Sequence, residues 1–169
     1  VPVVRDADQK SIAGLALGAG AVAVFEGPEP AYRDLYDRIA SRVSLVPRLR
    51  QRVLDVPFGI ARPVWIDDAQ FTLEDHLRWT DLPSDDDPGA LPDLVGRLLS
   101  HQLDRGRPLW TMWLVSGLPH DRFAVISQAH MAMVDGVSGT DPLALVTDQM
   151  HAACAVTGWH PRSRPSDLE

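Results

Sequence analysis

The chain has 169 residues, of which 45% are hydrophobic and 23% charged, so it is long enough for one domain with a sizeable core. Its net charge of −7 argues against a nucleic-acid binder that works by neutralising phosphates. The single cysteine, Cys154, cannot form an intrachain disulfide, which favours a reducing compartment. No apolar run approaches the roughly 18–20 residues of a membrane-spanning helix, and a basic secretory start is missing. We therefore expect a cytoplasmic protein that contacts a membrane at most peripherally.

The first part of the chain predicts a strand followed by a helix. Residues 20–26 have the β-branched and aromatic content of a buried strand. Residues 31–44 place apolar side chains at helical spacing, with charged side chains between them. This pattern is typical of an amphipathic helix that lies on a sheet. Three arginines alternate within residues 47–52, and we interpret them as an exposed strand or helix face.

The middle of the chain predicts a short strand, a loop and a strong helix. Residues 64–67 read as the strand, and residues 71–79 show partial alternation. His76 lacks a second ligand at metal spacing, so we interpret it as structural. The acidic run at 85–87 is typical of a solvated loop, and we predict no metal site there. Residues 91–103 form the strongest helical pattern, with leucines at i, i+3, i+7, i+8 and i+12.

The last part predicts a hairpin, a helix and a linker. Residues 109–115 and 123–128 read as strands, and residues 117–121 between them have hairpin-loop chemistry. We therefore expect two adjacent antiparallel strands. A helix is predicted over 140–153, because Thr140 can cap it and Pro142 falls in its first turn. From residue 158 the composition of Trp, Pro, Arg and Ser is that of a linker or extended crossing segment.

The segment 123–139 organises the chain. It reads FAVISQAHMAMVDGVSG, an apolar strand that runs into a turn with one histidine, His130, and one aspartate, Asp135. A buried strand that delivers such side chains to its end is suited to acyl transfer, because the fold holds the side chains rigidly while the turn faces a cavity.

Residues 130–136, HMAMVDG, resemble the HHxxxDG signature of condensation-type acyltransferases, and the following VSG narrows the resemblance to the bacterial wax ester synthase/diacylglycerol acyltransferase family. The resemblance covers most of the chain from about Ala21 onward. It is supported by further segments in the expected order: VAVFEGP at 22–28, PFGIARPVWIDD at 57–68, LDRGRPLWTMWLV at 103–115 and the proline-containing tail at 159–165.

The resemblance implies an α+β fold that is one half of a chloramphenicol-acetyltransferase-like two-domain architecture, with a mixed sheet flanked by helices. Residues 1–157 would be the N-terminal acyltransferase-like domain, and residues 158–169 a linker toward a C-terminal half of the same protein. The implied reaction moves a fatty acyl group from acyl-CoA to the hydroxyl of diacylglycerol or a long-chain alcohol, in triacylglycerol or wax ester synthesis. It uses acyl-CoA as a substrate and no metal or other cofactor. The arginines of 47–52 then have coenzyme A phosphates as an alternative role.

The sequence departs from the family pattern at residue 131. The resemblance assigns general-base catalysis to the second histidine of the signature, and that position holds Met131, whose thioether cannot deprotonate an alcohol at neutral pH. His130 corresponds to the first histidine. Because side chains alternate along a strand, His130 points away from Met131 unless a bulge or turn re-aims it.

The predicted site follows from this comparison. His130 lies in the active-site loop, and Asp135 is structural, shaping that loop. Two interpretations stay open: an acyltransferase, or a catalytically silent acyltransferase-like module that binds lipid or a partner. The predicted site residues are His130, Met131 and Asp135 for catalysis, and Gln128, Gly136 and Ser138 for substrate binding, with Gln128 a hydrogen-bond donor to an acyl group.

Overall fold

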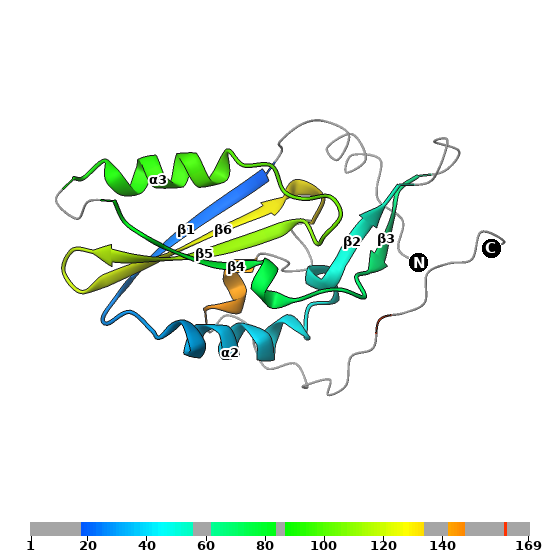
Figure 1. The fold of residues 1–169 in the computed structure, drawn as a ribbon, viewed down its shortest axis with the longest axis horizontal. Coiled ribbons are helices and arrows are strands. Elements are labelled where there is room, and N and C mark those ends of the chain that lie inside the picture. The colour runs from blue at the N-terminus through cyan, green and yellow to red at the C-terminus, as the bar shows by residue number, and fades with distance from the viewer. Residues whose placement is uncertain (1–17, 56–61, 84–86, 134–141, 148–160, 162–169) are drawn as a thin grey trace.

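A computed structural model describes residues 18–55, 62–83, 87–133, 142–147 and 161 of the chain. Its centre is a four-stranded mixed sheet. In spatial order the strands are β1 (Gly18–Glu26), β6 (Arg122–His130), β5 (Trp110–Leu118) and β4 (Leu77–Asp81). Strand β6 pairs antiparallel with both neighbours, whereas β4 pairs parallel with β5. A separate antiparallel pair, β2 (Gln51–Leu54) and β3 (Val64–Asp67), lies beside one end of this sheet (Figure 1).

Two helices cover opposite faces of the sheet. Helix α2 (Tyr32–Val43) lies on one face and α3 (Ala90–Leu99) on the other (Figure 1). Because side chains alternate along each strand, β5 and β6 supply apolar residues to both layers. Under α2, Ile39 packs in a core with Leu114 and Val125. Under α3, Leu94 packs in a smaller core with Ile126. The α+β class and the mixed sheet flanked by helices are therefore confirmed.

Most predicted elements are present. The strands over 20–26 and 64–67 and the helix over 31–44 are confirmed as β1, β3 and α2. The predicted hairpin is confirmed as β5 and β6, joined by a turn in which His120 and Asp121 have positive φ. Residues 71–79 divide into a 3-10 turn, η3 (Leu73–Asp75), and the start of β4.

Three predictions differ from the structure. Helix α3 ends at Leu99 rather than near residue 103, and the Gln128 amide donates hydrogen bonds to the Leu99 and His101 carbonyls where the helix stops. The arginine run divides between a 3-10 turn, η1 (Pro47–Arg50), and β2, and Arg50 is buried rather than on an exposed face. Where an α-helix is predicted from 140, the described part is a 3-10 turn, η5 (Pro142–Leu145); the remainder of that prediction lies outside the described residues.

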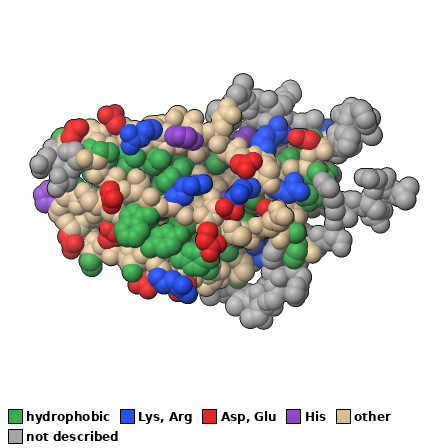
Figure 2. Space-filling model, viewed as in Figure 1, with side chains coloured by type: hydrophobic (Ala, Val, Ile, Leu, Met, Phe, Trp, Pro, Cys, Tyr) green, Lys and Arg blue, Asp and Glu red, His purple; other side chains and the backbone are tan. Residues whose placement is uncertain are grey.

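The surface carries charges of both signs interspersed over the face shown in Figure 2, with apolar side chains gathered toward its lower centre. Over the described part of the chain, no helix is long and apolar enough to cross a membrane. Among the same residues no group of three or more His, Cys, Asp or Glu side chains could hold a metal ion. The predicted boundary at 157/158 lies outside the described residues.

Candidate functional site

Strand β6 carries the signature segment to one end of the sheet. It lies between β1 and β5, and its residues from Ala124 to Ala129 are buried. At its last residue the His130 backbone N–H donates to the Leu109 carbonyl at 2.9 Å, while His130 stands opposite Gly18 of β1. A strand fixed on both sides holds its final side chain in a defined position.

The ring of His130 is held by the turn that follows it. Its Nδ1 accepts a hydrogen bond from the Ala132 backbone N–H at 3.2 Å. A neutral imidazole that accepts at Nδ1 carries its proton on Nε2 and is a donor there. In this arrangement His130 shapes the turn and is not poised to take a proton from an alcohol.

Met131 begins a 3-10 turn, η4 (Met131–Met133), directly after β6 ends. The strict alternation of a strand therefore stops at His130, and a local turn follows it. The sequence gave no direct sign of this turn. Met131 is 45% exposed, whereas Ala132 and Met133 after it are buried. The position where the family has its general base is thus presented at the surface of the described residues. Asp135, Gly136 and Ser138 lie outside the described residues.

Gln128 lies two residues before His130 on the same face of β6. It is only 4% exposed, and its Nε2 donates to the carbonyls of Leu99 at 3.1 Å and His101 at 3.0 Å. Its Oε1 is buried and accepts no hydrogen bond in the described part of the structure. Both amide hydrogens are thus used at the end of α3, and the donor role toward an acyl group that the sequence suggested stays a prediction.

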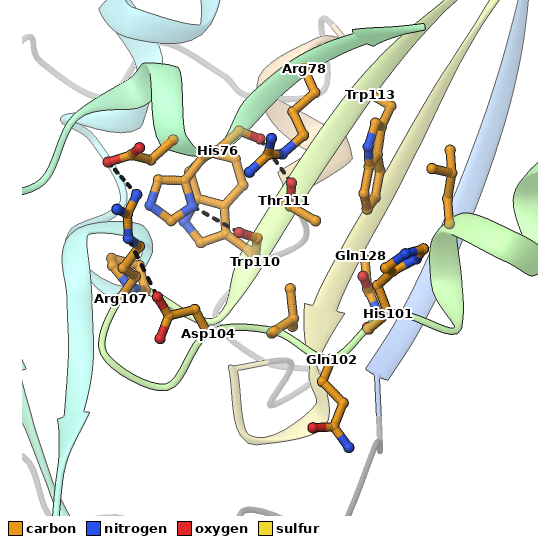
Figure 3. A pocket seen from close by; sticks show the side chains of 14 residues that line it. His76, Arg78, His101, Gln102, Asp104, Arg107, Trp110, Thr111, Trp113 and Gln128 are labelled. Atoms are coloured by element: carbon orange, nitrogen blue, oxygen red, sulfur yellow. Dashed lines mark hydrogen bonds and ion pairs between the residues drawn. The ribbon is translucent and has the colours of Figure 1, made fainter.

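A cavity of about 570 Å³ adjoins Gln128 on the α3 side of the sheet. This volume lies within the range of ligand pockets. Figure 3 shows Arg78 projecting toward Thr111, with Trp113 and Gln128 beyond it and His76 and Arg107 on the other side. The lining residues come from η3, β4, the end of α3, the loop after it, β5 and β6: Asp75, His76, Arg78, Leu98, His101, Gln102, Leu103, Asp104, Arg107, Pro108, Trp110, Thr111, Trp113 and Gln128.

His76 forms part of the cavity wall and is 3% exposed. Its Nδ1 lies 2.8 Å from the Trp110 carbonyl, and its ring stacks on Trp110, with centroids 4.6 Å apart, and on Phe71. Burial is the main cause that lowers the pKa of His76 below its usual value. The imidazole is therefore neutral at pH 7, with the proton on Nδ1 donated to the carbonyl. The structural interpretation of His76 agrees with this packing.

An ion-pair cluster borders the cavity. Arg107 pairs with Asp75 and also lies 3.5 Å from Asp104. The hydrogen bond from Arg107 is the main cause that lowers the pKa of Asp75. His76 and this cluster also line a second hollow, of about 770 Å³, that opens toward β3 and Arg52. The paired side chains of Asp75, Asp104 and Arg107 therefore line both cavities.

Among the cavity residues, sequence reasoning named only Gln128 as a site residue, and those it missed include Arg78, Thr111 and Trp113. Each lies on a strand, and alternation within β4 and β5 places all three on the α3 face. For Arg78 and Thr111 the available signal was a charged or polar residue at a strand position whose neighbours are apolar, in LRWTD and WTMWLV. That pattern indicates a face, but it does not indicate that α3 ends early enough to leave the face open.

The fold is shared with known acyltransferases and condensation domains. The first condensation domain of the calcium-dependent antibiotic synthetase matches 79% of this chain and 34% of its own, with a TM-score of 0.62 and 19% identity, which establishes a likeness of fold alone. The wax ester synthase/diacylglycerol acyltransferase of Marinobacter aquaeolei VT8 matches 81% of this chain and 36% of its own, with a TM-score of 0.62 and 30% identity. The chain therefore has the fold of this acyltransferase class.

The family follows from the sequence matches. The model of the wax ester synthase/diacylglycerol acyltransferase catalytic domain matches residues 14–168, so the chain belongs to that family. The probable diacylglycerol O-acyltransferase tgs3 of Mycobacterium tuberculosis is 42% identical over 108 residues, which cover 64% of this chain and 40% of the relative. The probable diacylglycerol O-acyltransferase tgs1 of the same organism is 36% identical over 135 residues, covering 80% of this chain and 29% of the relative.

Proposed function

We propose that this chain is the N-terminal half of an acyl-CoA-dependent O-acyltransferase that esterifies diacylglycerol or a long-chain alcohol. The observation that carries this is the family match over residues 14–168, with the signature segment starting at the end of the buried central strand. The names of tgs3 and tgs1 support diacylglycerol as acceptor, and the name of the Marinobacter protein supports wax esters as well. The chain spans 40% of tgs3 and 29% of tgs1, so the activity belongs to a longer protein.

In the proposed reaction the acceptor hydroxyl oxygen attacks the thioester carbonyl of acyl-CoA. The new C–O bond forms, the C–S bond breaks, and the hydroxyl proton ends on the sulfur of the released coenzyme A. In the family pattern an imidazole at residue 131 would carry that proton. Here a thioether stands at that position, and positioned proton transfer contributes typically about 10²–10⁴-fold to a rate. Slow turnover is therefore expected of the natural chain.

His130 is assigned a positioning role in this scheme. Its Nδ1 bond to the Ala132 N–H fixes the start of the turn in which Met131 lies, so it sets where residue 131 is presented. Asp135 is proposed to shape the same loop, and Gly136 and Ser138 to contact substrate. No further cofactor is required, since acyl-CoA brings the activated acyl group. We further propose that a C-terminal half, reached through residues 158–169, completes the site, and that membrane contact is peripheral.

The experiment that tests the function is an acyl-CoA turnover assay on the full-length protein with diacylglycerol and with a long-chain alcohol as acceptors. Ester formation that requires acyl-CoA supports the proposal. His130→Ala is expected to reduce it more than His130→Gln, because glutamine offers an acceptor oxygen to the Ala132 N–H. An absence of ester with every acceptor, in both natural protein and Met131→His, would contradict the proposal.

Met131 favours a second candidate, a catalytically silent module that binds lipid or a partner. This candidate keeps the fold and cavity but loses proton transfer. It is distinguished by the natural protein forming no ester above the uncatalysed rate while still binding coenzyme A in a calorimetric titration. Turnover that appears only with Met131→His would support the silent module.

A further inference from the structure

The segment that follows the signature is held on helix α2 by one arginine. Arg42 lies in the last turn of α2 and is half-buried. Its Nη1 donates to the Leu145 carbonyl at 3.0 Å and to the Thr147 carbonyl at 2.7 Å. Hydrogen bonds from a charged donor are roughly twice as strong as neutral ones. Arg42 therefore fixes η5 and the residues directly after it to a helix that lies far away in the sequence.

Segment η5 needs such a partner, because a single 3-10 turn cannot satisfy its own last carbonyls. It lies between α2 and the sheet, in contact with α2, β5 and β6 (Figure 1). Leu145 is only 1% exposed, so its carbonyl is largely out of reach of water. A buried carbonyl without a donor destabilises the fold, and the loss of Arg42 would therefore loosen η5.

Segment η5 shares its core with the turn that carries Met131. Met133 of η4 and Leu145 of η5 are each 1% exposed, and both are buried in one hydrophobic cluster with Ile39 of α2. The described residues on both sides of 134–141 are thus packed under the same helix. A shift of η5 in this core would be felt by η4, because protein interiors are close-packed.

The two sides have different anchors. On the first side, the Nδ1 of His130 accepts a hydrogen bond from the Ala132 N–H and fixes the start of η4. On the second side, the guanidinium of Arg42 fixes η5. A reacting side chain keeps a productive position only if the structure around it is held rigidly, so the position of residue 131 depends on both anchors.

We propose that Arg42 is a positioning residue for acyl transfer, which holds η5 and thereby fixes where the side chain of residue 131 is presented. The inference rests on the proposed function, because residue 131 is where the family pattern places the group that carries the proton. In this role Arg42 contacts neither substrate. Its substitution is expected to change kcat rather than KM, since a misplaced catalytic group weakens the transition state and not substrate binding.

The test measures ester formation by the full-length Met131→His protein, which has an imidazole at the position concerned, with and without Arg42→Met. Methionine keeps an apolar stem and removes every donor. We expect kcat per folded molecule to fall about 10- to 100-fold, with the KM for acyl-CoA changed less than about 3-fold. The same substitution in the natural protein, which has no imidazole to misplace, should lower kcat less than about 3-fold.

Two further variants separate this role from a merely structural one, which would lower the folded fraction and leave kcat per folded molecule unchanged. Arg33→Met is the matched control, because Arg33 lies on the same helix with its side chain 82% exposed and pairs with Asp37. It should leave kcat unchanged. Arg42→Lys keeps a cationic donor and should recover part of the kcat, and it replaces Arg42→Met in the comparison if that variant does not fold.

Hydrogen exchange of the natural protein and Arg42→Met gives a readout that does not depend on turnover. Exchange should become faster at residues 131–133 as well as at 142–147. A change confined to 142–147 would mean that η4 does not depend on η5, and the proposal would be wrong. An equal fall of kcat in the Met131→His and natural proteins, or no fall in either, also overturns it while the proposed function stands. If no protein in the series forms ester, the proposed function fails, and this role of Arg42 fails with it.

Discussion

The two faces of the four-stranded sheet are built from the same strands, but they are covered differently. Under α2 the face is closed by apolar packing, in which Ile39, Met112 and Leu114 are fully buried. Under α3 the apolar layer covers only part of the sheet, and toward the end of β6 it gives way to Gln128 and the cavity. Because side chains alternate along a strand, the same strand can place core residues on one face and cavity residues on the other.

The largest expected effect belongs to the position after β6. Met131→His restores an imidazole where the family pattern has its base, and should raise ester formation by about 10²–10⁴-fold if the rest of the site is intact. The measurement is the initial rate of ester formation from acyl-CoA in the full-length protein. Met131→Gln, a polar side chain of similar length without a basic nitrogen, serves as the control. An equal gain from both variants would mean that polarity, rather than proton transfer, limits the rate.

The closed face should be far more sensitive to truncation than the open one. Ile39→Ala removes buried methyl groups from the core under α2 and should lower the free energy of unfolding by about 2–5 kcal/mol. Arg78→Ala on the open face should change it by about 0.5 kcal/mol or less, because Arg78 is exposed. Urea denaturation of both variants checks this. Similar losses from the two would remove the distinction between the faces.

Two glycines in the α3 layer differ in the space around them, so substitution by alanine should have opposite effects on stability. A Cβ added to Gly20 of β1 would lie 2.3 Å from Leu99 Cδ1 and 3.1 Å from Leu99 Cγ. Gly20→Ala should therefore cost about 1–3 kcal/mol through overpacking against α3. Gly96 of α3 has open space around such a Cβ, so Gly96→Ala should stabilise by about 0.5–1 kcal/mol through helix propensity. Thermal unfolding with opposite shifts for the two variants is the expected result.

The most gradual effect is the dependence of stability on pH at His76. Burial lowers its pKa in the folded state, so below about pH 6.5 the unfolded chain binds a proton that the folded chain does not. The free energy of unfolding should therefore fall as the pH is lowered through this range, by at most about 1.4 kcal/mol per pH unit from this residue. The lowered pKa of Asp75 acts only at lower pH, since it concerns a carboxyl.

The check is urea denaturation of the natural chain and of His76→Gln between pH 7.5 and 5.5. Glutamine keeps a donor for the Trp110 carbonyl and does not titrate, so the slope should become shallower in the variant. An unchanged slope would mean that other groups titrate in this range.

The sequence predicted the layers better than the cavity. Helical and alternating patterns identified α2, α3 and the β5–β6 hairpin, because each pattern reports burial on one side of a single element. The cavity depends on where α3 stops, and that end is set by Gln128, a residue far away in the sequence. Arg50 was placed on an exposed face for a related reason, since a charged residue gives no local sign that it is buried and donates to the Ser44 carbonyl.

The catalytic segment was only partly predictable. The motif identified His130 and the substitution at Met131, but strand periodicity gave no sign that the backbone turns into η4 immediately after His130. The hydrogen bond from the Ala132 N–H to Nδ1, which decides the tautomer of His130, exists because of that turn. Gln128 was predicted to donate to an acyl group, and no local pattern indicated that its amide donates to two carbonyls from α3 and the loop after it.

The central claim is that the end of β6 lies at the centre of acyl transfer. It is tested most directly by a crystal structure of the full-length protein with an acyl-CoA analogue in which a stable thioether replaces the thioester. The account predicts that the acyl carbon nearest the sulfur contacts the Met131 side chain. An analogue bound with its reactive end away from residues 130 and 131 would contradict it.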